Sequence, residues 1–154
     1  MKKLMLIALA SLALQAQPIV TRVATATIAV DDYDKAIEWY TQKLGLVKTH
    51  DAKFHDERFV TVAPADQKDF EIALAKVGMT PREREEKKSA IGNSGPFVFH
   101  TADCRHAYEV LRERGVEFKE TPRDMPWGTQ AVALDLYGNS IVLLQPKQRR
   151  AGGG

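Results

Sequence analysis

VDDYDKAIEWYTQKLGL at residues 30–46 and TADCRHAYEVLRERGVE at residues 101–117 are two stretches of one pattern, and they decide how this 154-residue chain folds. Each follows a strand-like run, places an aspartate before a helical pattern and then reaches a glycine, which are the signals of a helix start and stop. Allowing a slip of one residue, the matched positions are Val30 with Thr101, Asp32 with Asp103, Ala36 with Ala107, and Gly45 with Gly115. The repeat predicts two copies of one structural unit.

Strand-like runs surround both helical patterns. Residues 22–30 read RVATATIAV and alternate with the period of two that is typical of a strand. Further runs of this kind cover residues 46–53, 58–64 and 69–77 in the first half, and residues 97–102, 116–120, 129–136 and 140–145 in the second half. Each half therefore has the order strand, helix and three strands, or βαβββ.

This order predicts an α+β fold with a cavity. A four-stranded sheet with one helix leaves its other face uncovered, so two such units must bury those faces together. We expect two βαβββ modules, residues 22–78 and 95–146, to form a curved eight-stranded mixed sheet or half-barrel with a central cleft. Residues 79–94 are expected to be a charged linker with one short helix, and residues 147–154 a flexible tail.

Composition excludes several partners. The chain has 22 basic and 20 acidic residues, which is too balanced to attract nucleic acid or an anionic membrane surface. Cys104 is the only cysteine, so the chain forms no internal disulfide. A hydrophobic fraction of 44% with 27% charged residues is typical of a globular domain.

The N-terminus has the pattern of an export signal. Lys2 and Lys3 precede an apolar run at residues 4–14 that is too short to span a membrane comfortably. We expect residues 1–17 to be a signal peptide, the mature protein to be exported to a bacterial periplasm, and no stable membrane span to remain after processing. The alternative is an uncleaved apolar helix that packs on the domain or a partner, with a cytoplasmic location.

The motifs resemble those of the vicinal oxygen chelate superfamily, which includes glyoxalase I, extradiol dioxygenases, fosfomycin-resistance proteins and bleomycin-binding proteins. The resemblance covers residues 23–146 and is to the group of small glyoxalase-like proteins. It rests on the segments VDD at residues 30–32, AIEWY at 36–40, LGL at 44–46 and DLYGNS at 135–140. It implies the paired βαβββ fold and a homodimer.

The resemblance also implies four metal-ligand positions, which are usually His and Glu. They fall here on Thr25, Pro96, Val142 and a residue near Ile72 or Ala73, with Glu71 as an alternative at the last. Proline and valine offer no side-chain donor, and a threonine hydroxyl is a poor ligand for a divalent ion. We therefore expect no metal site of the family type and no cofactor.

Other residues are candidates for ligand contact. His100 follows Pro96 by four residues on one strand, so both side chains point to the predicted cleft, where an imidazole can act as acid, base or ligand anchor. The alternative for His100 is a hydrogen-bonded packing role. The full set of predicted ligand-binding residues is Thr25, Thr27, Arg58, Ala73, Pro96, His100, Trp127 and Val142.

Three hypotheses about function follow. The first is metal-free binding of a small organic molecule, similar to sequestration by bleomycin-resistance proteins. The second is a lyase- or isomerase-type glyoxalase-like enzyme that uses His100 or a displaced metal site with Glu71; the sequence leaves the question of catalysis open and favours binding. The third is a structural or interaction module of the cell envelope with a collapsed cleft.

Overall fold

The computed structural model describes residues 22–55, 57–78 and 80–147. The predicted export signal at residues 1–17 and the tail residues 148–154 lie outside this part of the chain. The elements, in chain order, are β1 (Thr25–Val30), α1 (Tyr33–Glu38), the π-helical turn η1 (Trp39–Lys43), β2 (Val47–Phe54), β3 (Glu57–Ala63), β4 (Glu71–Lys76), α2 (Pro81–Lys87), the 3-10 turn η2 (Lys88–Ala90), β5 (Phe97–His100), α3 (Cys104–Glu113), β6 (Glu117–Met125), β7 (Gly128–Leu134) and β8 (Ser140–Pro146). Over the described residues, no helix has the length and apolar character to cross a membrane.

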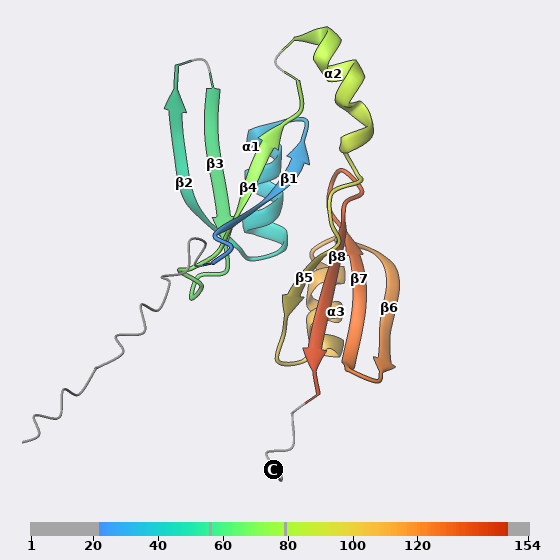
Figure 1. Ribbon diagram of the computed structural model, residues 1–154. Helices are drawn as coiled ribbons and strands as arrows, with labels where there is room; N and C mark the ends of the chain where they lie inside the picture. The colour runs from blue at the N-terminus through green and yellow to red at the C-terminus, as the bar shows by residue number, and fades with distance from the viewer. Residues whose placement is uncertain (1–21, 56, 79, 148–154) are drawn as a thin grey trace, which may run out of the picture.

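The eight strands form two mixed sheets of four, which confirms the predicted α+β fold of two βαβββ modules. The strand orders are β1-β4-β3-β2 and β5-β8-β7-β6, with β1 parallel to β4 and β5 parallel to β8. In Figure 1, α1 lies behind the first sheet and α3 behind the second, and α2 belongs to the connection between them. Both sheets therefore have one face covered by a helix and one face without a helix.

The two matched aspartates begin the two module helices. The carboxylate of Asp32 accepts a hydrogen bond from the backbone N–H of Lys35, and that of Asp103 accepts one from His106, each at 3.0 Å. These bonds satisfy N–H groups that have no partner inside the helix. The repeated aspartates are therefore helix caps, as the sequence predicts.

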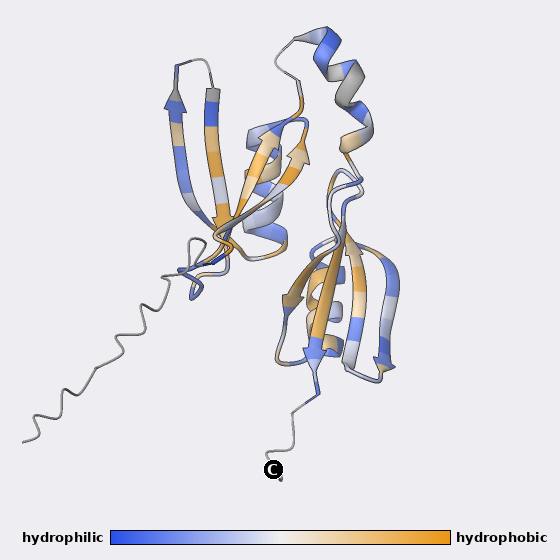
Figure 2. Cartoon of the chain, in the orientation of Figure 1, coloured by the Kyte–Doolittle hydropathy of each residue, from blue (hydrophilic) through white to orange (hydrophobic). Residues whose placement is uncertain are grey.

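One continuous core joins both modules on the helix side of the sheets. It is built from alternate strand residues and from the inner faces of α1 and α3: Ile28, Val30, Ala36, Tyr40, Leu46, Val60, Val62, Ile72, Leu74, Cys104, Leu111, Val116, Ala131, Ala133, Ile141 and Leu143. In Figure 2, the central strands β4 and β8 are more hydrophobic than the outer strands β2 and β6. The core thus holds the modules together from the helix side and leaves the opposite faces uncovered.

The sheets do not join into the single eight-stranded sheet that the sequence suggested. The reason lies at the edge of β1, where side chains take the backbone groups that a neighbouring strand would use. The Ala29 N–H donates to the Ser94 hydroxyl at 2.9 Å, and the Ala29 carbonyl accepts from Asn139 Nδ2 at 3.5 Å. The first strand is thereby tied to the second module without strand pairing.

A buried polar network crosses the seam between the modules. The Tyr40 hydroxyl of η1 donates to the Asp135 carboxylate at 2.6 Å, and Asp135 also accepts from the backbone N–H of Tyr137 and from Asn139. The Tyr137 hydroxyl in turn exchanges hydrogen bonds with the backbone N–H and carbonyl of Asp32, both at 3.0 Å. These bonds fix the orientation of one module relative to the other, because Tyr40 and Asp32 belong to the first module and Asp135 and Tyr137 to the second.

Tyr40 makes the stability of the protein sensitive to alkaline pH. Burial, then the negative charge of Asp135 and its hydrogen bond, raise the pKa of Tyr40 far above its usual value. Unfolded Tyr40 loses its proton near pH 10 and folded Tyr40 keeps it, so stability is fully present below pH 10 and falls as the pH rises further. Above the pKa that Tyr40 has in the unfolded chain, we expect this residue to lower the free energy of unfolding by about 1.4 kcal/mol per pH unit. Urea unfolding of the wild type and of Tyr40→Phe at several pH values above 10 measures this effect. If the free energy of unfolding falls equally steeply with pH in both proteins, the prediction is wrong.

Candidate functional site

The first-module face, defined as the side of the first sheet opposite α1, contains three of the predicted ligand-binding residues. Thr27 of β1 and Ala73 of β4 are direct neighbours across the parallel pair, and Thr25 is the neighbour of Glu71. Ile28, Val30, Ile72 and Leu74 alternate with these residues and are buried toward α1. Alternation therefore places Thr25, Thr27 and Ala73 together on the uncovered side.

A polar cluster that the sequence did not predict lies on the same face. His50 Nδ1 of β2 is 3.0 Å from Thr61 Oγ1 of β3 and 3.2 Å from Glu71 Oε1 of β4. Thr61 Oγ1 is also 2.6 Å from Thr49 Oγ1. Phe59 lies beside the cluster, with its ring centre 6.4 Å from that of His50. Three strands thus bring an imidazole, a carboxylate and an aromatic ring together.

The second-module face, the side of the second sheet opposite α3, contains Pro96, His100 and Val142. Val142 pairs with Val98 on one side and Val132 on the other. Pro96 and Val142 line one hollow of about 290 Å³. The other residues around this hollow are Gly92, Asn93, Ser94, Gly95, Lys119, Glu120, Val132 and Ser140. A proline and a valine thus stand in a hollow where the family resemblance implies metal ligands.

Trp127 lies in the tight turn between β6 and β7. The sequence suggested a longer loop here, but β6 continues to Met125, so that Pro126 and Trp127 alone connect the two strands. The indole N–H of Trp127 donates to the Gln130 side chain at 2.9 Å. Gln130 alternates with buried Ala131 and so lies on the second-module face. The indole is 53% exposed and is therefore accessible to a ligand on this side.

Arg58 lies on the other side of the first sheet from the position that the sequence suggested. It alternates with Phe59 and shares a face with buried Val60, toward α1. Its guanidinium donates to Asp51 at 2.8 and 2.9 Å and to Asp34 of α1 at 2.8 Å. The ion pairs with Asp51 and Asp34 hold Arg58 against the helix, and its pKa is raised by these hydrogen bonds.

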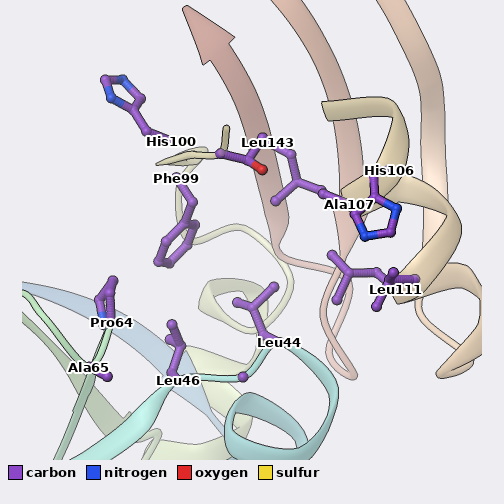
Figure 3. Close-up of a pocket in the computed structure, with 13 residues that line it drawn as sticks. Leu44, Leu46, Pro64, Ala65, Phe99, His100, His106, Ala107, Leu111 and Leu143 are labelled. Carbon is purple, nitrogen blue, oxygen red and sulfur yellow. The ribbon is translucent and has the colours of Figure 1, made fainter. Parts of the chain in front are cut away.

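A groove between the modules has a volume of about 370 Å³ and is mainly apolar. Figure 3 shows Phe99 of β5 pointing toward Pro64 and Leu46 of the first module, while His100 points away from these residues. His106 of α3 lies at the other end of the groove. This groove contains none of the predicted residues except His100, so the structure does not bring the predicted set into one cavity.

The donors available for a metal are few in the described part of the chain. Among residues 22–55, 57–78 and 80–147, no three His, Cys, Asp or Glu side chains come together in a way that could hold a metal ion. His50 and Glu71 supply two donors near each other, and Thr25 adds only a hydroxyl. Divalent transition metals in proteins normally need three or four such ligands.

The paired βαβββ modules define a two-module α+β class, and comparison identifies its family. A model of the glyoxalase/bleomycin resistance protein/dioxygenase superfamily matches residues 22–143. This chain belongs to that superfamily.

Relatives share the fold over nearly their whole length. YurT of Bacillus subtilis (strain 168) is 33% identical over 125 residues, which are 80% of this chain and 98% of YurT. The crystal structure of UcmS2 is 35% identical with a TM-score of 0.76, covering 82% of this chain and 98% of UcmS2. TnmS3, described as an antibiotic binding protein from Streptomyces sp. CB03234, is 27% identical with a TM-score of 0.71, covering 85% of this chain and 100% of TnmS3.

Proposed function

We propose that this protein binds a small, planar organic molecule on the uncovered faces of its two sheets, without a resident divalent metal. The observation that carries the proposal is the exposure of large apolar side chains on these faces. Phe59, Val98 and Trp127 are 44%, 55% and 53% exposed. Single apolar residues are common on protein surfaces, but these three lie on or beside two sheet faces that no helix covers, and uncovered apolar surface is typical of interaction sites.

The residues around these side chains favour binding over metal chemistry. Thr25, Ala73, Pro96 and Val142 lie on the faces at the positions where the resemblance implies metal ligands, and together they provide one hydroxyl as a side-chain donor; Glu71, the alternative to Ala73, would add one carboxylate. This donor set is too small for a divalent ion, which would supply the Lewis acid for stabilising an enediolate or activating oxygen. The similarity to TnmS3, an antibiotic binding protein, supports a binding role for the fold.

We also propose that two copies of the chain associate as a homodimer. A second copy would cover the exposed apolar residues of both faces and would place two modules from different chains opposite each other. A face that a partner closes can surround a ligand, whereas one open sheet contacts it from one side only. Sedimentation velocity should give twice the mass of one chain; a monomer at all concentrations would contradict the dimer.

Binding can be tested with bleomycin and with 7-methoxy-4-methylcoumarin, a planar fluorescent probe. In buffer with EDTA, we expect saturable binding of at least one of them, and Val98→Asp should weaken that binding by about tenfold or more because it places a charge on an apolar contact surface. Val23→Asp is the matched control, since Val23 is 74% exposed and precedes β1. Binding that EDTA abolishes and added zinc restores would contradict the metal-free proposal.

A further inference from the structure

We infer that His50, held by Glu71 and Thr61, is a hydrogen-bond acceptor on the first-module face for the hydroxyl group of an aromatic ligand. The inference rests on the proposed function, because it specifies the kind of molecule that this face binds. It concerns a side chain on β2, which is not one of the four positions where the family carries metal ligands, although its neighbour Glu71 is the alternative residue at one of them.

Glu71 determines which ring nitrogen of His50 carries the proton. Its carboxylate oxygen is 3.2 Å from His50 Nδ1, and its side chain is 23% exposed. A carboxylate beside an imidazole nitrogen favours the form in which that nitrogen has a hydrogen to donate. A lone pair on Nδ1 would instead face the negative charge. Neutral His50 therefore carries its hydrogen on Nδ1.

The hydroxyl groups of Thr61 and Thr49 are consistent with a hydrogen on His50 Nδ1. Thr61 is fully buried, so its hydroxyl needs partners within the protein. With Nδ1 as a donor, Thr61 Oγ1 accepts from His50 and its own hydrogen points to Thr49 Oγ1. Among the described residues, every buried side-chain nitrogen and oxygen has a hydrogen-bond partner. This direction of donation gives the buried Thr61 hydroxyl its partners, and the nearby negative charge of Glu71 favours the same position of the His50 hydrogen.

The consequence is a free acceptor on Nε2. With the hydrogen on Nδ1, Nε2 carries a lone pair, and none of the described residues forms a hydrogen bond with it. The His50 side chain is 60% exposed. The negative charge of Glu71 disfavours an anionic ligand at this point, whereas a hydroxyl group donates a hydrogen bond without bringing a negative charge.

Phe59 indicates that the rest of the ligand is aromatic. Its ring is 44% exposed and lies beside His50. The neighbouring positions on this face, Ala52, Ala73 and Ala75, have short side chains, so these positions place no large group beside Phe59. An aromatic ring can stack on Phe59 and direct a ring hydroxyl toward His50.

The ring protonation can be measured without a ligand. Nitrogen NMR of the full chain distinguishes a protonated from an unprotonated imidazole nitrogen. We expect His50 to show hydrogen on Nδ1 and a bare Nε2 in neutral form, and Glu71→Gln to reduce this preference. The opposite arrangement in the wild type would overturn the inference, whatever the protein binds.

The ligand preference is tested with 4-methylumbelliferone, which has a ring hydroxyl, and its ether 7-methoxy-4-methylcoumarin. The wild type should bind the hydroxyl compound about tenfold more tightly, the difference expected of one hydrogen bond to a partly exposed acceptor. His50→Ala should remove this preference and still bind the ether, and Glu71→Gln should reduce it. His106→Ala, which changes an exposed histidine on α3, is the matched control and should keep it.

The outcomes separate the two proposals. Equal binding of both coumarins by the wild type would overturn the role of His50 and leave small-molecule binding in place. A preference that His50→Ala retains would also overturn it. If neither these coumarins nor bleomycin binds, the proposed function fails and the inference fails with it.

Discussion

Replacing Asp135 with alanine is expected to lower the free energy of unfolding by about 3–5 kcal/mol. Asp135 is 6% exposed and accepts four hydrogen bonds, from the Tyr40 hydroxyl, the Tyr137 and Asn139 backbone N–H groups and the Asn139 amide. The alanine variant leaves the buried Tyr40 hydroxyl and Asn139 amide without this acceptor. Because the bonds join both modules, their loss should weaken the docking of the modules as well as the local turn.

Two variants separate this effect from a general loss of acidic charge. Asp135→Asn keeps one acceptor oxygen and should be less destabilising than Asp135→Ala. Asp66→Ala removes an exposed carboxylate from the turn between β3 and β4 and should change stability by less than about 0.5 kcal/mol. Urea denaturation measures all three. A cost for Asp135→Ala below about 1 kcal/mol would show that the network does not stabilise the seam.

Gly128→Ala is expected to cost about 3 kcal/mol or more. A Cβ at this position would lie 2.2 Å from the Gln145 carbonyl oxygen and 3.0 Å from the Pro146 Cα, both on the adjacent strand β8. Backbone atoms cannot move aside as a flexible side chain can, so β7 and β8 must separate. The turn that carries Trp127 would move with them. Urea unfolding should report the change, and so should the fluorescence of Trp127 measured in a Trp39→Phe background.

Gly115→Ala is the control for backbone strain without a backbone clash. Gly115 has a φ of +80°, but its added Cβ would meet only the flexible Lys43 Nζ, at 3.7 Å. We expect a cost of about 1–2 kcal/mol from the left-handed conformation alone. If Gly128→Ala costs no more than Gly115→Ala, the contact between β7 and β8 does not restrict residue 128.

Local patterns were sufficient to predict the elements of both modules. Asp32 and Asp103 precede helices because their side chains can cap backbone N–H groups within three residues, a property of nearby sequence. The alternation of small and apolar residues in β1 likewise predicts that Thr27 and buried Ile28 point to opposite faces of the sheet, since this too depends only on neighbouring residues. Where the pattern changes within an element, the prediction is weaker: β6 extends to Met125 although residues 121–125 contain a proline and three polar residues.

The candidate site depended on details that such patterns do not contain. A β-bulge between Lys48 and His50 shifts the register of β2, so counting by twos does not predict that His50 contacts Thr61. The predicted cleft-facing position of Arg58 is wrong, because Arg58 lies two residues before buried Val60 on β3 and therefore points to the same side as Val60. Glu71 was noticed as a candidate ligand, but its partner comes from a strand some twenty residues away in the chain.

From the two matched stretches at residues 30–46 and 101–117, the sequence by itself determined the βαβββ repeat, its helix caps and the apolar residues that the helices cover. The repeat, the caps and the buried positions depend on interactions between residues that are close together in the sequence. Only the tertiary structure decided that the strands form two sheets, that Tyr40 and Asp135 join them, and that His50, Thr61 and Glu71 meet on one face. Such contacts depend on strand register and module docking, which involve residues far apart in the chain and leave no local periodic signal.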